Sequence, residues 1–405
     1  MHRDLGPDAL ADELDSVLGD VDAHLAARYP GDPGTRQPVH TVYVPADRFR
    51  PGLSAEWGAA ALELFDAHTP TPAHVAEVWG LTPDLAADVH ERVRAKLVVE
   101  PIEDLRVDFE DGYGIRPDTE EDADALRVAR SLNGAAPFVG IRFRSFEAVT
   151  RRRGVRTLHA FLGALDAVPD GFGLTLPKVT APEQVSALVT TLERLEAEFG
   201  LPPVRFEIQV ETPQSVLGPD GTSPLPRMIA LAAGRCSGLH YGTYDYSASL
   251  GIAAQHQSME HPAADHAKAV MQLAAAGTGV RLSDGSTNVL PVGSPSDVRA
   301  AWALHGRLVR RSLERGFHQG WDLHPGHLPS RFVAGFAFYR EAFPTAAARL
   351  RAYRGRADSG FLDEPATARA MAGFLLRGLR CGALDAGELE SATGCPATTL
   401  EALAR

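Results

Sequence analysis

The chain has 405 residues, of which 44% are hydrophobic, and its formal net charge at pH 7 is −12. Such a chain can bury a substantial core, which is typical of a soluble globular protein. The acidic balance and the lack of a basic tail argue against nucleic acid or an anionic membrane as the main partner. No apolar run reaches the roughly 20 residues that cross a bilayer. The three cysteines form no C-x-x-C pair, so we expect a reducing, cytoplasmic location.

The first predicted element is a helical N-terminal extension, which we place at residues 1–36. Its apolar residues recur at helical spacing, and "YPGDPG" ends the helix. These residues are Leu10, Leu14, Leu18, Val21 and Leu25. After the first strand signal, residues 51–100 hold two or three predicted helices. One connection between a strand and the next would need only one helix, so we interpret this region as an insertion.

Strand and helix signals then alternate along the chain. The strand candidates lie near residues 40–45, 105–110, 137–143, 172–177, 204–210, 237–242, 278–282 and 317–323. Eight strands alternating with helices favour a TIM (β/α)8 barrel, whose usual size is roughly 250 residues, over a doubly wound sheet. We assign the barrel to residues 37–350, and a C-terminal helical lid and tail to residues 351–405.

The stretch "LRVDFEDGYG" at residues 105–114 ends an apolar run with Asp108, Glu110 and Asp111. Strand side chains alternate between faces, so Asp108 and Glu110 share one face. Active sites of barrels lie at the C-terminal ends of the strands, where other polar residues of this chain also fall. Acids from three strands would repel one another without a cation, and Mg²⁺ takes carboxylates and water. The pattern therefore predicts a metal site at the barrel mouth.

Seven motifs occur in an order that is specific to a known group of proteins. "DFEDGYG" resembles the D-x-E-D strand of the citrate lyase β subunit and of its HpcH/HpaI aldolase and malyl-CoA lyase relatives. The other motifs are "YVPADRF", "GIRFRS", "LTLPKVTAPEQV", "IQVETPQSVL", "LHYGTYDYSASLG" and "WDLHPGHL". The resemblance covers roughly residues 40 to 380. It implies a metal-dependent barrel of the pyruvate and phosphoenolpyruvate type.

The resemblance also implies roles for individual residues. Glu211 and Asp245 match the carboxylates that hold Mg²⁺, for which Mn²⁺ can substitute. Arg142 matches the arginine that grips the keto-acid portion of the substrate, and Glu110 matches an acid that reaches the metal through water. "GFLDEPATARAM" resembles a mobile lid, often donated to a neighbouring subunit, in which Asp363 would be the acid/base.

From these matches we expect three groups of site residues. The expected catalytic residues are Asp363, Asp111 and Glu110, the expected substrate contacts are Arg142, Lys178, Asp108 and His324, and the expected metal ligands are Glu211 and Asp245. The sequence departs from the family pattern where Arg144 replaces an asparagine and where His327 replaces a glutamine. These departures leave the substrate open.

The implied function is that of a Mg²⁺-dependent carbon–carbon lyase or aldolase. Its substrate would be a small oxo or hydroxy acid or its coenzyme A thioester, it would react through a metal-stabilised enolate, and the protein would be a homo-oligomer. Two alternatives stay open at this stage. One is a metal-independent Schiff-base aldolase that uses Lys178, because a lysine at a barrel strand end suits that chemistry. The other is a non-catalytic barrel that binds a metal and a small acid.

Overall fold

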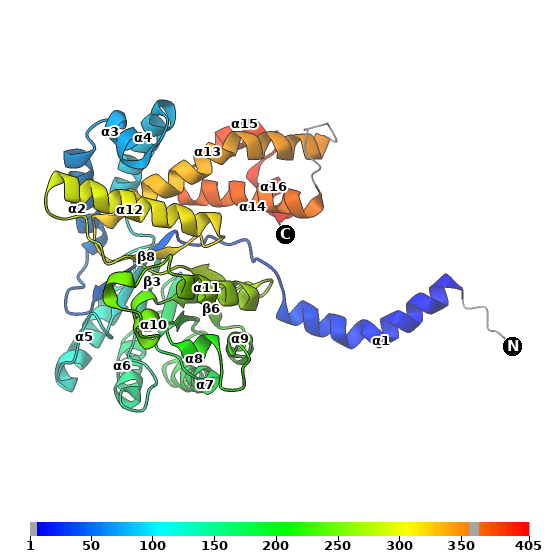
Figure 1. Cartoon of the computed structure of the whole chain (residues 1–405). Helices are drawn as coiled ribbons and strands as arrows, with labels where there is room; N and C mark the ends of the chain where they lie inside the picture. The colour runs from blue at the N-terminus through cyan, green and yellow to red at the C-terminus, as the bar shows by residue number, and fades with distance from the viewer. Residues whose placement is uncertain (1–5, 356–363, 405) are drawn as a thin grey trace.

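The structure is a computed structural model, and it describes residues 6–355 and 364–404. Its centre is a barrel of eight parallel strands surrounded by helices (Figure 1). The strands are β1 (His40–Pro45), β2 (Asp104–Asp108), β3 (Phe138–Arg142), β4 (Phe172–Leu176), β5 (Phe206–Val210), β6 (Cys236–Tyr241), β7 (Arg281–Ser283) and β8 (Gly320–Asp322). The sheet runs from β7 in descending order to β1 and then to β8, and a parallel bridge between Ser283 and Gln319 joins its two ends. The predicted TIM barrel is confirmed.

Helices follow the strands and cover the outside of the barrel. They are α5 (Asp118–Ser131), α6 (Arg151–Gly163), α7 (Pro182–Phe199), α8 (Pro213–Val216), α9 (Leu225–Leu231), α10 (Thr243–Ser249), α11 (Pro262–Ala275), α12 (Pro295–Glu314) and α13 (His327–Gly355), with a short 3₁₀ turn at Ala254–His256. The apolar face of each main helix packs on the barrel; in α7, for example, Leu188 and Leu192 are fully buried. No helix among residues 6–355 and 364–404 is long and apolar enough to cross a bilayer.

Three helices stand between β1 and β2, where the sequence predicts two or three: α2 (Leu53–His68), α3 (Pro72–Trp79) and α4 (Pro83–Val99). They pack against α12 and α13, and their buried side chains belong to the main hydrophobic core (Figure 1). Aromatic rings join α2 and α3 to α12. The Trp79 and Trp302 rings stack with their centroids 5.6 Å apart, and the Phe65 ring lies 6.2 Å from that of Trp302.

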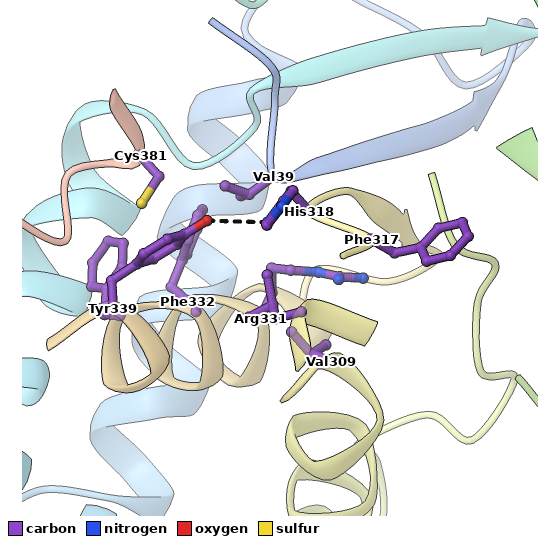
Figure 2. A pocket seen from close by; sticks show the side chains of 11 residues that line it. Val39, Val309, Phe317, His318, Arg331, Phe332, Tyr339 and Cys381 are labelled. Atoms are coloured by element: carbon purple, nitrogen blue, oxygen red, sulfur yellow. Dashed lines mark hydrogen bonds between the residues drawn. The ribbon is translucent and has the colours of Figure 1, made fainter. Parts of the chain in front are cut away.

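The C-terminal helices are α14 (Pro365–Cys381), α15 (Ala386–Thr393) and α16 (Ala397–Ala404). They form a separate apolar cluster with the second half of α13. Figure 2 shows where α13 and α14 meet the barrel: Tyr339 and Cys381 approach His318, and the Tyr339 hydroxyl lies 3.4 Å from His318 Nδ1. His318 lies two residues before β8, and Val39 beside it directly precedes β1.

This arrangement places α14 at the N-terminal ends of the strands, whereas the site expected from the sequence is at their C-terminal ends. The helix therefore does not form a lid over the mouth of its own barrel. A lid over the mouth of a neighbouring subunit stays a prediction. Asp363 lies outside the described residues.

The inside of the barrel contains a buried ion-pair layer below the mouth. Arg106 is paired with Asp104 at 2.5 Å and with Glu207 at 3.2 Å, and all three side chains are buried. Two glycines line the space beside this arginine, and a Cβ on Gly140 would also overlap the Gly173 carbonyl oxygen of the next strand. A Cβ on Gly173 would lie 3.3 Å from Arg106 Nη2, and one on Gly140 would lie 3.0 Å from Nη1.

Arg106→Met is expected to lower the free energy of unfolding by about 3–5 kcal/mol, because it leaves two buried carboxylates without their cation. Urea denaturation would measure the loss. Arg156→Met is the matched control, because Arg156 pairs with Asp122 on the exposed surface, where ion pairs contribute little. Equal losses in the two variants would show that the buried layer is not needed for stability.

Candidate active site

Charged residues from five successive strands converge at the barrel mouth. Asp108 ends β2, Arg142 ends β3, Lys178 follows β4 and Glu211 follows β5. Asp245 lies in α10, directly after β6. The C-terminal ends of parallel barrel strands meet on one side, so these residues lie close together although they are distant in sequence.

Arg142 is held in a fixed orientation by Asp108. Its Nε and Nη2 each donate to a separate carboxylate oxygen of Asp108 at 2.7 Å, and its guanidinium carbon lies 4.8 Å from the centroid of the Tyr43 ring. Its third nitrogen, Nη1, lies 3.4 Å from Gln209 Oε1 and 3.7 Å from Glu110 Oε2. Burial alone would lower the pKa of Arg142, but Asp108 outweighs it, and the pKa is raised. The guanidinium therefore stays charged.

Asp108 also organises the turn that follows its own strand. Its carboxylate accepts the backbone N–H groups of Glu110 at 3.0 Å and of Gly112 at 2.9 Å. A Cβ on Gly112 would lie 2.7 Å from Asp108 Oδ2, so only glycine fits there without a shift. Both oxygens of Asp108 are thus engaged by Arg142 and by the turn, so Asp108 holds Arg142 in place. The predicted contact of Asp108 with the substrate stays a prediction.

Lys178 brings a second cation to the acids. Its ammonium lies 2.5 Å from Glu110 Oε1, 2.6 Å from Asp111 Oδ2 and 4.0 Å from Asp245 Oδ1. Burial alone would lower the pKa of Lys178, but the carboxylates, Glu110 foremost, raise it above its usual value. A protonated amine is not a nucleophile, so these contacts argue against the Schiff-base alternative.

The backbone of Lys178 contributes to the site as well. Its φ angle is 50°, in the left-handed region that is uncommon outside glycine. In this conformation its N–H donates to Glu211 Oε1 at 2.7 Å. Strained backbone of this kind persists where surrounding contacts over-determine it, which is common at functional sites.

Glu211 is fully buried at the mouth, with a relative exposure of 1%. Its Oε2 accepts a hydrogen bond of 2.5 Å from the amide of Gln209. Burial raises the pKa of Glu211 to about 8; Lys178 and Arg142 oppose that shift, and Asp245 adds to it. The carboxylate thus lies in a place where an additional cation would be stabilised.

The donor chemistry of this pair fits a magnesium ion. Mg²⁺ is usually held by one or two carboxylates and keeps several waters. Glu211 is buried, while the Asp245 side chain is 45% exposed and open to water. Within residues 6–355 and 364–404 there is no group of three or more His, Cys, Asp or Glu side chains that could hold a metal. A closed zinc site is therefore not formed by the described residues, whereas a two-carboxylate Mg²⁺ site is compatible with them.

His324 is less closely connected to the acids. Its Nδ1 accepts the N–H of Gly326 at 3.0 Å, and its ring centroid lies 6.5 Å from that of His327. Arg144 and His327, where the sequence departs from the family pattern, contact other residues than the mouth acids. Arg144 donates to Glu121 at 2.8 Å, and the buried His327 contacts the Val289 carbonyl oxygen at 2.9 Å.

Two residues of the site were not found from the sequence, Gln209 and Tyr43. Gln209 links Arg142 to Glu211, and Tyr43 lies against the Arg142 guanidinium. A signal for Gln209 was available, since it stands two residues before Glu211 and strand side chains two apart share a face. Nothing local marks Tyr43, because its contact with Arg142 crosses strands.

Solved structures confirm the barrel fold. CitE from Mycobacterium tuberculosis, solved with magnesium, acetoacetate and coenzyme A, is 16% identical with a TM-score of 0.51, over 86% of this chain and 99% of that chain. Haloferax volcanii malate synthase, solved with magnesium and glyoxylate, is 13% identical with a TM-score of 0.50, over 91% of this chain and 97% of that chain. These likenesses establish that the chain has the barrel fold of citrate lyase β-like proteins.

The chain itself belongs to the family described as Domain of unknown function (DUF6986), whose sequence model matches residues 18–405. A search of curated proteins found no match.

Proposed function

We propose that this chain is a carbon–carbon lyase or aldolase that acts on a small oxo or hydroxy acid with the help of Mg²⁺. The observation that carries the proposal is the buried Glu211 beside Asp245, within reach of an arginine that Asp108 holds in place. The similar solved structures support it, since they contain magnesium with acetoacetate or with glyoxylate.

In this proposal Arg142 orients the substrate. Its charge is fixed by Asp108, and a guanidinium matches the geometry of a carboxylate or carbonyl oxygen. Glu211 and Asp245 would hold the cation, which supplies a Lewis acid for negative charge that develops on a substrate oxygen. Gln209 positions Glu211 and Arg142 relative to each other through one amide.

Among the described residues, Glu110 is the better candidate to carry a proton. Burial raises the pKa of the Glu110 carboxyl. For Asp111, burial also acts to raise the pKa, but hydrogen bonds with Lys178 and Glu110 outweigh it and the pKa is lowered. A carboxyl whose pKa moves towards neutrality suits general acid–base catalysis. Asp363 stays a further proposed acid/base.

Isothermal titration of the metal-free protein with Mg²⁺ or Mn²⁺ tests the metal assignment. Binding is expected in the native chain and expected to be lost in Glu211→Gln and in Asp245→Asn, because each change removes one carboxylate charge from a two-carboxylate site. Glu260→Gln is the control, since Glu260 pairs with Arg307 on the surface. Native-like Mg²⁺ binding in both site variants would show that Glu211 and Asp245 are not the metal ligands.

Mg²⁺ affinity is expected to rise with pH. Because burial raises the pKa of Glu211 to about 8, a cation that binds its ionised form displaces a proton below that pH. The affinity should increase by about tenfold per pH unit from about pH 6 to about pH 8 and then level off. Titrations in two buffers of different ionisation enthalpy would detect the released proton. A constant affinity over this range would show that Glu211 is already ionised or is not a ligand.

The substrate is tested in two forms. A coenzyme A thioester is the second form to test beside the free acid, since CitE was solved with coenzyme A. Turnover of free oxo and hydroxy acids should be compared with that of their thioesters. Borohydride trapping with pyruvate separates the Schiff-base alternative, because an adduct on Lys178 together with EDTA-resistant activity would favour it. Ligand-induced stabilisation without any turnover would favour a non-catalytic barrel.

A further inference from the structure

Helix α1 (Pro7–Arg28) leaves the body of the protein and has no buried residue (Figure 1). Its apolar residues lie three, four or seven positions apart, so they form one stripe about 100° wide along the helix. The stripe consists of Leu10, Leu14, Val17, Leu18, Val21 and Leu25, whose relative exposures are between 44% and 68%. A stripe of this size at the surface marks an interaction site.

The rest of α1 is strongly acidic. The helix contains six acidic residues and a single arginine, Arg28. The acidic residues are Asp8, Asp12, Glu13, Asp15, Asp20 and Asp22. Two such helices side by side would bring like charges together, at an energetic cost. The chemistry of α1 therefore suits a partner surface that is apolar in its centre and basic around it.

The same chain has a cleft with that chemistry. It has a volume of about 590 Å³ and lies between the start of β7 and α14. Its basic residues are Arg281, Arg369, Arg377 and Arg380, and apolar side chains beside them include Val280, Leu282 and Leu376. Only two acids are among the described lining residues: Asp32, which pairs with Arg377, and Glu401, which pairs with Arg380. The cleft is thus cationic in a chain whose net charge is −12.

The segment after α1 directs the helix away from the cleft of its own chain. Gly31 N donates to the Gly277 carbonyl at 2.8 Å, Asp32 pairs with Arg377 at 3.2 Å, and Arg281 donates to Thr35 Oγ1 at 2.6 Å. These anchored residues form one wall of the cleft, and α1 extends outward from them (Figure 1). A helix that enters the cleft must therefore come from another molecule.

We propose that α1 of one copy packs its apolar stripe into the arginine-lined cleft of a second copy, with its acidic residues facing the arginines. If each copy donates its helix to the other, the exchange closes as a symmetric dimer, the commonest oligomer. The mode of recognition is that of an amphipathic helix in a groove.

Light scattering coupled to size-exclusion chromatography tests the proposal on the full chain. The full chain should be oligomeric, and it should become monomeric on deletion of residues 1–28 and in Leu14→Ser/Leu18→Ser. High salt should weaken the oligomer, because it screens the attraction between the acidic residues and the arginines. Arg369→Glu should weaken the oligomer, because Arg369 is exposed in the cleft. Val149→Ser changes an exposed apolar residue outside α1 and the cleft, and it should leave the oligomer intact. A monomeric full chain, or an oligomer that persists without residues 1–28, would overturn the proposal.

Cross-linking identifies the partner surface. The three natural cysteines are buried, so new surface thiols react selectively with a short bismaleimide. A mixture of Leu18→Cys and Ala370→Cys copies should cross-link between molecules. Efficient cross-linking of Leu18→Cys copies with one another would mean that two α1 helices pair, and failure of the mixed pair would mean that the cleft is not the partner. Either result would overturn the assignment of the cleft.

Discussion

Arg142→Lys is expected to reduce the turnover number by about 10²–10³-fold, the loss that follows removal of one pre-organised donor from an active site. Lysine keeps the charge beside Asp108, but it cannot use both carboxylate oxygens and still present a third nitrogen at the mouth. Steady-state kinetics with a substrate that the native chain converts would measure the loss. The Michaelis constant should rise as well, because substrate orientation depends on the same group.

Arg144→Lys provides the comparison for this prediction. Arg144 is the neighbouring strand-end arginine, and it is bound to Glu121 and to the Gly114 carbonyl instead of to the mouth acids. Its replacement should leave turnover near the native value. If Arg142→Lys also kept native turnover, Arg142 would not be the group that orients the substrate. Arg142→Met is less informative, because it leaves Asp108 buried and unpaired and would be destabilised by about 3–5 kcal/mol.

Gly242→Ala is expected to weaken Mg²⁺ binding by about 10–100-fold, the usual effect of disturbing a group that supports a metal ligand. A Cβ on Gly242 would lie 2.5 Å from Glu211 Cβ and 2.8 Å from its Oε2. The backbone φ of −98° at this position suits alanine, so the effect comes from the displaced Glu211 side chain alone. Titration calorimetry with Mg²⁺ would measure it.

The matched control is Gly335→Ala in α13, where no atom lies within 4 Å of the added Cβ. Alanine is favoured over glycine inside a helix, so this variant should be at least as stable as the native chain and should bind Mg²⁺ normally. Native Mg²⁺ affinity in Gly242→Ala would show that the close approach of β5 and β6 does not set the position of Glu211.

The amino-acid sequence by itself determined the order and type of the elements. Strand alternation, helical periodicity and turn residues act over short distances, and for that reason each of the eight strands overlaps its predicted range, although β7 (Arg281–Ser283) is shifted towards the end of its range. The same signals placed Asp108, Arg142 and Glu211 at strand ends. In a parallel barrel all such ends meet at one mouth, so their convergence followed from the fold class.

Only the tertiary structure decided which of these charges pair. Asp108 binds Arg142, and Lys178 lies between Glu110 and Asp111, because distances across neighbouring strands select the partners. The raised pKa of Glu211 likewise depends on burial, which no local pattern specifies. The direction in which a helix leaves the barrel also depends on long-range packing. For this reason α14 lies at the end of the barrel opposite the mouth, and α1 extends outward with its apolar stripe uncovered.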